Sequence, residues 1–190
     1  ATNIIMGHTY KGIDSRIYHN FQVTLKEILK ISNNIPEKKL VVKLHPGKPP
    51  VDIISKILDE IKPPLEVSKT GNIFDHIINS DIVISTEFST VLIDAMILKK
   101  PTITFLFDDK GFQNEKIIQS GATAYVKNIQ EFSEVLNKIL TDDDFQKNLV
   151  NKGTKFINNY MTNPGHSSEF LAKYVHDMWF LPKSELIKNA

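Results

Sequence analysis

The strongest constraint on the fold is a regular alternation of short apolar runs with longer amphipathic stretches. Buried strands are expected at residues 3–8, 40–44, 65–68, 81–85, 102–106 and 123–126. Helical spacing of apolar residues fills the gaps, at 15–31, 51–61, 72–79, 89–98 and 114–119. Strands separated by helices pair in parallel, and right-handed crossovers place helices on both faces of the sheet. The sequence therefore predicts an α/β fold, a Rossmann-like doubly wound parallel sheet of about six strands.

The domain organisation follows from the rest of the chain. Beyond the last expected strand the pattern is helical only, at residues 129–140, 143–160 and 167–179. No Gly/Ser-rich linker marks a second domain within the 190 residues. A single nucleotide-binding domain over residues 1–180, with a helical C-terminal segment, and a tail at 181–190 are expected. The first residue is Ala rather than Met, which favours a fragment of a longer protein.

Composition excludes several classes of function. The formal net charge is only +1, far from the strongly basic field of a non-specific nucleic-acid binder, so no nucleic-acid partner is expected. Cysteine is absent, which rules out disulfides, thiolate metal sites and a cysteine nucleophile and is compatible with the cytoplasm. No apolar run approaches the roughly 20 residues that a membrane helix needs.

The polar turn of residues 85–90, Ser-Thr-Glu-Phe-Ser-Thr, lies where ligands bind in such sheets, beyond the carboxyl end of a strand. Ser89 and Thr90 come where a helix begins, with Ser89 or Phe88 as its N-cap. Their hydroxyls either cap the helix or join its free N–H groups in holding a phosphate. Asp94 follows within the helix and either accepts hydrogen bonds from ribose hydroxyls or is an ordinary exposed helix position.

Histidines give a second candidate. His45 ends an expected strand and is followed by Pro46, so it either donates to a phosphate oxygen or is a solvated strand end. His76 is interpreted as helix surface and His8 as a weak candidate. The sequence contains no zinc-protease motif and no carboxylate cluster at metal-ligand spacing, so no metal site is expected. A G-x-G-x-x-G motif is missing after the first strand, which argues against NAD or FAD.

Three motifs together resemble the C-terminal half of GT-B glycosyltransferases. They are His45-Pro46, the stretch DIVISTEFSTVLIDA at residues 81–95, and Lys100-Pro101. They look most similar to the branch that contains CDP-glycerol glycerophosphotransferases and capsular polysaccharide transferases, although Glu87 stands where that branch tends to have Asp. UDP-GlcNAc 2-epimerases share the fold and a similar Ser-rich turn, but the second glycine of their turn is missing here.

The resemblance implies that the chain binds a nucleotide-activated sugar or polyol-phosphate donor, linked to uridine or cytidine. His45 and the helix start at Ser89 and Thr90 would contact the diphosphate, and Asp94 would hold the ribose. His45 and Glu87 are the catalytic candidates, with Glu87 facing the transferred group. The other donor-binding candidates are Ser85, Thr86, Ser167 and Ser168. No metal and no cofactor besides the donor substrate is implied.

GT-B enzymes consist of two Rossmann-like halves, and this chain has room for one. We expect the C-terminal half of a transferase for cell-surface polysaccharide or glycoconjugate synthesis, inactive without its N-terminal domain. The full-length protein would be cytoplasmic, with peripheral attachment at the inner face of the membrane as an alternative. Two other functions stay open at this point. They are half of a UDP-GlcNAc 2-epimerase-like enzyme and a non-catalytic module that binds a nucleotide or a protein.

Overall fold

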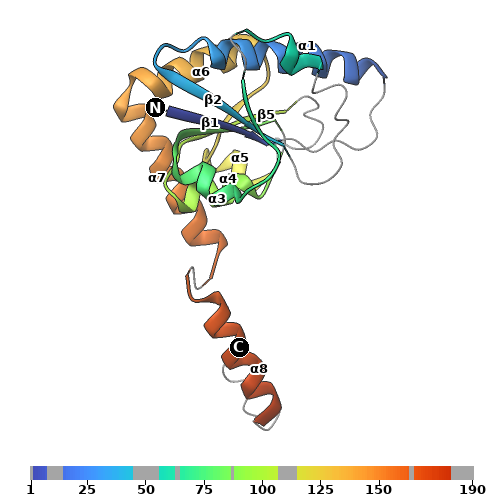
Figure 1. Cartoon of the computed structure of the whole chain (residues 1–190). Coiled ribbons are helices and arrows are strands. Elements are labelled where there is room, and N and C mark those ends of the chain that lie inside the picture. Colours follow the sequence, from blue (N-terminus) through green and yellow to red (C-terminus); the bar gives the residue numbers. More distant parts are fainter. Residues whose placement is uncertain are drawn as a thin grey trace. The chain divides into compact units, whose positions relative to one another are not determined.

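The architecture is a parallel sheet between helices. The computed structural model describes residues 2–7, 15–44, 56–62, 65–86, 88–106, 115–162 and 165–180. Its strands form one six-stranded sheet in the order β3-β2-β1-β4-β5-β6, with every neighbouring pair parallel (Figure 1). The strands are β1 (Thr2–Gly7), β2 (Lys38–Lys43), β3 (Glu66–Ser68), β4 (Ser80–Ser85), β5 (Thr102–Phe105) and β6 (Ala124–Val126). The predicted Rossmann-like α/β class is confirmed.

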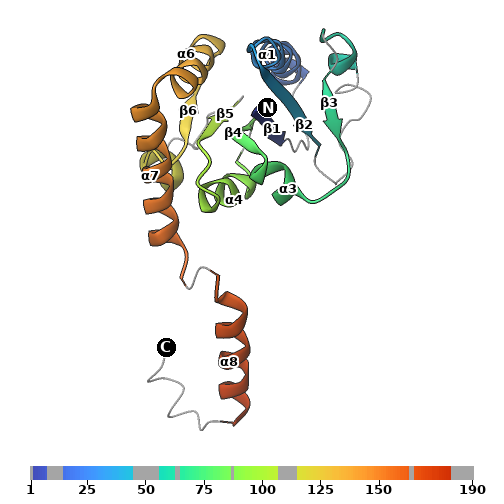
Figure 2. The ribbon, with the colours of Figure 1, turned by 60° about the vertical axis from the view of Figure 1, so that its left-hand side comes forward.

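Helices cover both faces of this sheet, as expected from the alternation. The helices in the described ranges of the chain are α1 (Ser15–Asn33), α3 (Ile73–Ile78), α4 (Val91–Ile97), α5 (Lys116–Gln119), α6 (Ile129–Thr141), α7 (Asp143–Tyr160) and α8 (Ser167–Phe180), and residues 56–59 are also helical. Figures 1 and 2 show α1 and α6 on one face and α3 and α4 on the other. We call these the first face and the second face.

The first face holds the larger hydrophobic core. Alternate residues of the strands point to it, including Val42, Ile84 and Ile103. These three residues lie at the same level of the sheet, because Met6 of β1 pairs with both Val42 and Ile84, and Ile84 pairs with Ile103. Helix α1 contributes Ile28 and Leu29, and α6 contributes Phe132, Leu136 and Ile139. The second face has a smaller cluster in which Ile77 of α3 and Ala95 of α4 pack with Val83 of β4. This core orients the strands and so fixes where their carboxyl ends meet.

Local signals explain the helix boundaries. The Asn128 side chain accepts a hydrogen bond from the Glu131 N–H (2.9 Å), and the Glu131 carboxylate accepts one from the Lys127 N–H (2.8 Å), which together cap the start of α6. At the end of α4, Lys99 adopts a left-handed conformation (φ 54°) that usually belongs to glycine. The Lys100 N–H then donates to the Ala95 carbonyl (2.8 Å), and the chain turns directly into β5.

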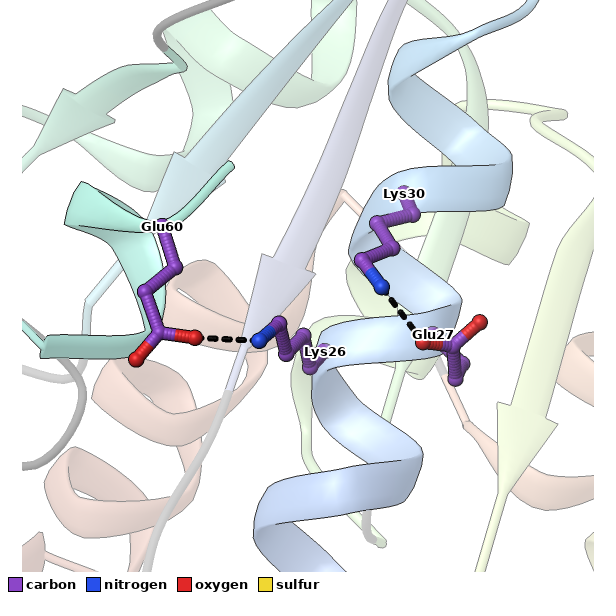
Figure 3. Close-up of polar contacts among 4 residues, drawn as sticks. All are labelled: Lys26, Glu27, Lys30 and Glu60. Carbon is purple, nitrogen blue, oxygen red and sulfur yellow. Dashed lines mark hydrogen bonds and ion pairs between the residues drawn. The ribbon is translucent and has the colours of Figure 1, made fainter. Parts of the chain in front are cut away.

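Ion pairs join surface elements on the first face. Lys26 of α1 binds Glu60, which follows the short helical segment at residues 56–59, and Lys30 binds Glu27 within α1 (2.8 Å; Figure 3). The Lys26 ammonium, through its hydrogen bond and then its charge, holds the pKa of Glu60 below its ordinary value. All four side chains are a third or more exposed, so these pairs add little to folding stability.

The chain divides into two compact units, residues 1–156 and residues 157–190. The first contains the whole sheet and both of its faces. The second contains α8, which carries exposed apolar side chains along its length, among them Phe170, Tyr174 and Met178. The single domain expected over residues 1–180 stays a prediction.

Candidate functional site

The candidate site begins with the turn that leaves β4, at the carboxyl edge of the sheet. Ser85 ends β4 and Thr86 follows it, and both side chains are fully buried. Neighbouring β5 places Thr104 beside Ser85 in the register of the sheet. The Thr104 hydroxyl makes a 2.8 Å hydrogen bond with the Thr123 hydroxyl, and Thr104 is also fully buried. The two predicted donor-binding residues thus lie in a buried polar layer where β4 meets the turn.

Ser89 and Thr90 lie where α4 starts, as expected. Thr90 is the N-cap, one residue beyond the predicted position, and its own side chain makes no capping hydrogen bond. The capping role instead belongs to Ser89, whose hydroxyl oxygen accepts a hydrogen bond from the Val91 N–H (3.3 Å). The Ser89 hydroxyl hydrogen is not used in that bond, and the Thr90 side chain is exposed. Both hydroxyls are therefore available to donate to an anion at this edge.

Asp94 lies in the first turn of α4 and is half-buried. Burial raises the pKa of its carboxyl above the ordinary value. Within the part of the chain that the structure describes, no hydrogen bond or ion pair satisfies its carboxylate oxygens. A partly desolvated carboxylate without a partner is unfavourable for folding and is typical of ligand-binding sites. Its chemistry suits the acceptance of two hydrogen bonds from neighbouring hydroxyl groups.

His76, interpreted from the sequence as helix surface, makes a side-chain hydrogen bond in the structure. It is half-buried in α3, and its Nε2 makes a 2.9 Å hydrogen bond with the hydroxyl of Ser68, the last residue of β3. The same hydroxyl donates to the Thr70 carbonyl (2.9 Å). A bond between a residue of α3 and the end of β3 has no local signal in the sequence. The loop from β3 to α3 is thereby tied to the carboxyl edge.

Sequence reasoning also missed Lys43, the last residue of β2. Its side chain is only 7% exposed. Its ammonium donates to two backbone carbonyls beyond the ends of β2 and β3, those of Leu44 (3.3 Å) and Lys69 (3.5 Å). The signal was present as a single lysine within the apolar run LVVKL, which predicts a strand but says nothing about a lone cation inside it.

The remaining predicted residues lie outside the described residues or in the second unit. His45 and Glu87, the two catalytic candidates, lie outside the described residues, as does His8. Ser167 and Ser168 begin α8 in the second unit, and both are exposed. Their assignment to donor binding stays a prediction.

Two further properties bear on the site. Among the described residues, no group of three or more His, Cys, Asp or Glu side chains is placed to hold a metal ion. None of the helices in the described ranges combines the length and the apolar character needed to cross a bilayer.

Residues 4–177 match the family of CDP-glycerol:poly(glycerophosphate) glycerophosphotransferases. No curated protein matches the chain. The fold is similar to that of a UDP-GlcNAc 2-epimerase from Neisseria meningitidis bound to UDP-GlcNAc (TM-score 0.63, 16% identity, 93% of this chain and 44% of that chain). It is also similar to the spinosyn rhamnosyltransferase SpnG (TM-score 0.62, 14% identity, 90% and 45%).

A third similar structure has about the same length as this chain. It is the C-terminal CMP-Kdo binding domain of WaaA from Acinetobacter baumannii, with a TM-score of 0.58, 13% identity, and coverage of 81% of this chain and 88% of that domain. By contrast, the chain spans less than half of the epimerase and of the rhamnosyltransferase. At these identities the likeness is one of fold, and it corresponds to one Rossmann-like half of a larger enzyme.

Proposed function

The chain belongs to the CDP-glycerol:poly(glycerophosphate) glycerophosphotransferase family, and we propose that it binds the nucleotide-activated donor of such a transferase at the carboxyl edge of its sheet. The observation that carries the proposal is the extent of the family match. Residues 4–177 include the turn after β4, Asp94, five complete strands and most of β1, so the match covers the edge where ligands bind in this fold. The similarity in fold and size to a CMP-Kdo binding domain supports the same function.

Asp94 is proposed to hold the ribose of the donor. Two hydrogen bonds from vicinal ribose hydroxyls would give its carboxylate the partners that it lacks among the described residues. Because such bonds favour the charged form, nucleotide binding should lower the Asp94 pKa toward its ordinary value. The burial cost that Asp94 imposes on the free chain is then offset only in the complex.

The diphosphate is proposed to lie near the start of α4, where the Ser89 and Thr90 hydroxyls are able to donate to it. His45 and Glu87 keep their proposed roles, His45 at the leaving phosphate and Glu87 toward the transferred group. Ser85 and Thr86 would shape the buried floor of this turn, and Ser167 and Ser168 would approach the donor from α8. In the reaction that the family name describes, an acceptor hydroxyl attacks the phosphorus of the glycerol phosphate. The bridging P–O bond breaks, and CMP leaves with the negative charge.

The proposal includes a second Rossmann-like half as partner, because the acceptor has to come from outside this domain. The complete transferase would act in the cytoplasm on cell-surface polysaccharide, at the inner face of the membrane in the alternative form of the proposal. The likeness to the 2-epimerase is one of fold alone, and no residue of this chain specifically favours that function.

Calorimetric titration with CDP, UDP, ADP, CMP and UMP tests the proposal. We expect one pyrimidine nucleotide to bind, and we expect Asp94→Ala to weaken it by roughly 100-fold, because two hydrogen bonds to a charged group are lost. Asp75→Ala is the matched control. Asp75 is likewise in the first turn of a short helix on the second face but is exposed, so its removal should leave binding unchanged. No binding of any nucleotide at millimolar concentration, or equal loss in both variants, would contradict the proposal.

A further inference from the structure

The last layer of the sheet on the second face is polar from β3 to β6. In the register of the sheet Ser68 pairs with Lys43, Gly7 with Ser85, Ser85 with Thr104, and Thr104 with Tyr125. Met6 of β1 pairs with Val42 of β2, so the next residue of each strand, Gly7 and Lys43, lies at the same level. These two residues complete the row between Ser68 and Ser85. The residues paired in the adjacent row are all apolar: Val67, Val42, Met6, Ile84, Ile103 and Ala124.

Lys43 supplies the only full charge in this polar row. Its side chain points to the second face, because Val42 and Leu44 on either side of it belong to the first-face core. A lysine is rarely buried to this degree unless a carboxylate pairs with it. No ion pair links the Lys43 ammonium to a carboxylate in the described ranges, and its two carbonyl contacts are longer than ordinary hydrogen bonds.

On the same surface of the sheet, the acidic side chain of Glu66 already has a cationic partner. Glu66 of β3 stands beside Val41 and forms an ion pair with Lys39, four residues before Lys43 on the same strand. Lys39 and Glu66 are both about half exposed, at the other end of β2. The strand therefore carries two lysines that point to the same face. Lys39 is paired in solvent, and Lys43 is buried without an anionic partner among the described residues.

We propose that Lys43 is a phosphate-binding residue whose ammonium neutralises the diphosphate of the bound nucleotide, an inference that rests on the proposed function. The ligand crevice of a doubly wound sheet lies where the strand order reverses, here between β1 and β4. Lys43 is on β2, next to β1, and the Gly7 position between Lys43 and Ser85 carries no side chain. Strands are spaced by roughly 4.8 Å, so Lys43 and the turn after β4 are about 10 Å apart across the edge.

This arrangement assigns the two charged groups of the edge to opposite parts of the ligand. Asp94 would accept hydrogen bonds from the ribose, and Lys43 would bind phosphate as a compact cation. The leaving phosphate gains charge as the bridging P–O bond breaks, and a buried cation stabilises it more than a solvated one would. A diphosphate should therefore depend on Lys43, whereas the nucleoside alone should not.

The test compares nucleoside and nucleotide in matched lysine variants. The probes are the diphosphate that the wild-type chain binds most tightly among CDP, UDP and ADP, and its own nucleoside, titrated calorimetrically at one ionic strength. Lys43→Met should weaken the diphosphate at least tenfold and leave the nucleoside unchanged. Lys39→Met, on the same strand and face, should change neither. Asp94→Ala should weaken both ligands, which separates loss of ribose contacts from loss of phosphate contacts.

The other outcomes of this test separate the role of Lys43 from the proposed function. Unchanged diphosphate binding by a folded Lys43→Met variant overturns the role of Lys43 and leaves the proposed function standing. A wild-type chain that binds no nucleotide overturns both. If Lys43→Met does not fold, the inference is tested on the wild-type chain by following the NMR resonances of the Lys43 side chain during titration. The Lys43→Arg variant serves to assign these resonances. They should shift with the diphosphate and not with the nucleoside, and an equal response to both would overturn the inference.

Discussion

The two faces of the sheet are built from the same strands but end differently at the carboxyl edge. On the first face the last row is apolar and continues into the large core under α1 and α6, and the charged residues above it are paired at the surface. On the second face the last row is polar, the buried cluster is small, and two charged groups, Lys43 and Asp94, are partly or wholly buried without a charged partner in the described residues. The difference indicates that the first face supplies most of the stability and that the second face contains the candidate site.

The largest effect on folding is expected in the first-face core. Phe132 of α6 is fully buried, and its ring meets that of Phe105 edge to face, with centroids 6.5 Å apart. Phe132→Ala should lower the free energy of unfolding by about 3–5 kcal/mol, because it removes apolar contact and leaves a cavity. Urea unfolding measures this.

The control for that prediction is a phenylalanine on the second face. Phe74 of α3 is 44% exposed, so Phe74→Ala should cost less than about 1 kcal/mol. Equal losses in the two variants would show that both faces contribute comparably to stability, and the division between them would fail.

A gain in stability is expected where α4 ends on the second face. Lys99 holds a left-handed conformation (φ 54°) that costs a residue with a side chain roughly 1 kcal/mol relative to glycine. Lys99→Gly should therefore raise the free energy of unfolding by up to about 1 kcal/mol, partly offset by the greater freedom of glycine in the unfolded chain. Lys100→Gly is the contrasting variant, because Lys100 does not have a positive φ and its ammonium donates to the Ile78 carbonyl (2.9 Å). It should lose stability, and a gain in both variants would mean that strain at Lys99 is not the cause.

Asp94 should change the free energy of unfolding by a smaller amount, and the sign of its contribution depends on pH. Because burial raises its pKa, the folded chain holds the Asp94 proton more tightly than the unfolded chain does. Its contribution favours folding below the unfolded pKa, about 3.9, and is lost as the pH rises through the folded pKa. Asn cannot ionise, so Asp94→Asn should gain stability relative to the wild type between acid and neutral pH while nucleotide binding falls.

The measurement for Asp94 is urea unfolding of both proteins at acid and neutral pH, with the proposed nucleotide absent. A variant that is less stable than the wild type at neutral pH would show that the carboxylate has a stabilising partner in the folded chain. Asp94 would then be a structural residue rather than a carboxylate that gains its hydrogen-bond partners only from a bound ligand.

The sequence alone predicted the sheet and the main turn for clear physical reasons. Strand and helix periods alternate without interruption, so parallel pairing and helices on both faces followed directly. The turn at residues 85–90 and the position of Asp94 in the next helix were also readable, since capping residues and a carboxylate one turn later are local features. The roles of His45 and Glu87 stay predictions.

What the sequence could not give depends on register and on single side chains. The polar row joins residues of strands that are far apart in the chain, and only the pairing of Lys43 with Ser68, and of Ser85 with Thr104, brings them to one level. The hydrogen bond of His76 with Ser68 has no local signal, because it joins a helix to the end of the preceding strand, and periodicity does not show which polar side chains will meet there. The left-handed conformation of Lys99 was hidden for a similar reason, since no glycine marks it.

The smallest effect is expected at the surface of the first face, where Glu60 contrasts with Asp94. The Lys26 ammonium lowers the Glu60 pKa, so this carboxylate stabilises the fold above its unfolded pKa, about 4.3, and loses that contribution as the pH falls through the folded pKa. Solvent screens the pair, and Lys26→Met should leave the unfolding midpoint nearly unchanged.

An NMR titration of the Glu60 carboxyl carbon measures the effect of the ion pair on the Glu60 pKa directly, whereas the unfolding midpoint should barely change. In Lys26→Met the Glu60 pKa should rise toward its ordinary value, and in Lys30→Met it should rise less, because Lys30 acts only through its more distant charge. An unchanged pKa in Lys26→Met would mean that α1 and residues 56–62 are not joined by this pair in solution. The Asp94 and Glu60 pKa values should then respond oppositely to their surroundings. Glu60 should rise when a protein cation is removed, and Asp94 should fall only when a nucleotide supplies the hydrogen bonds that the chain does not.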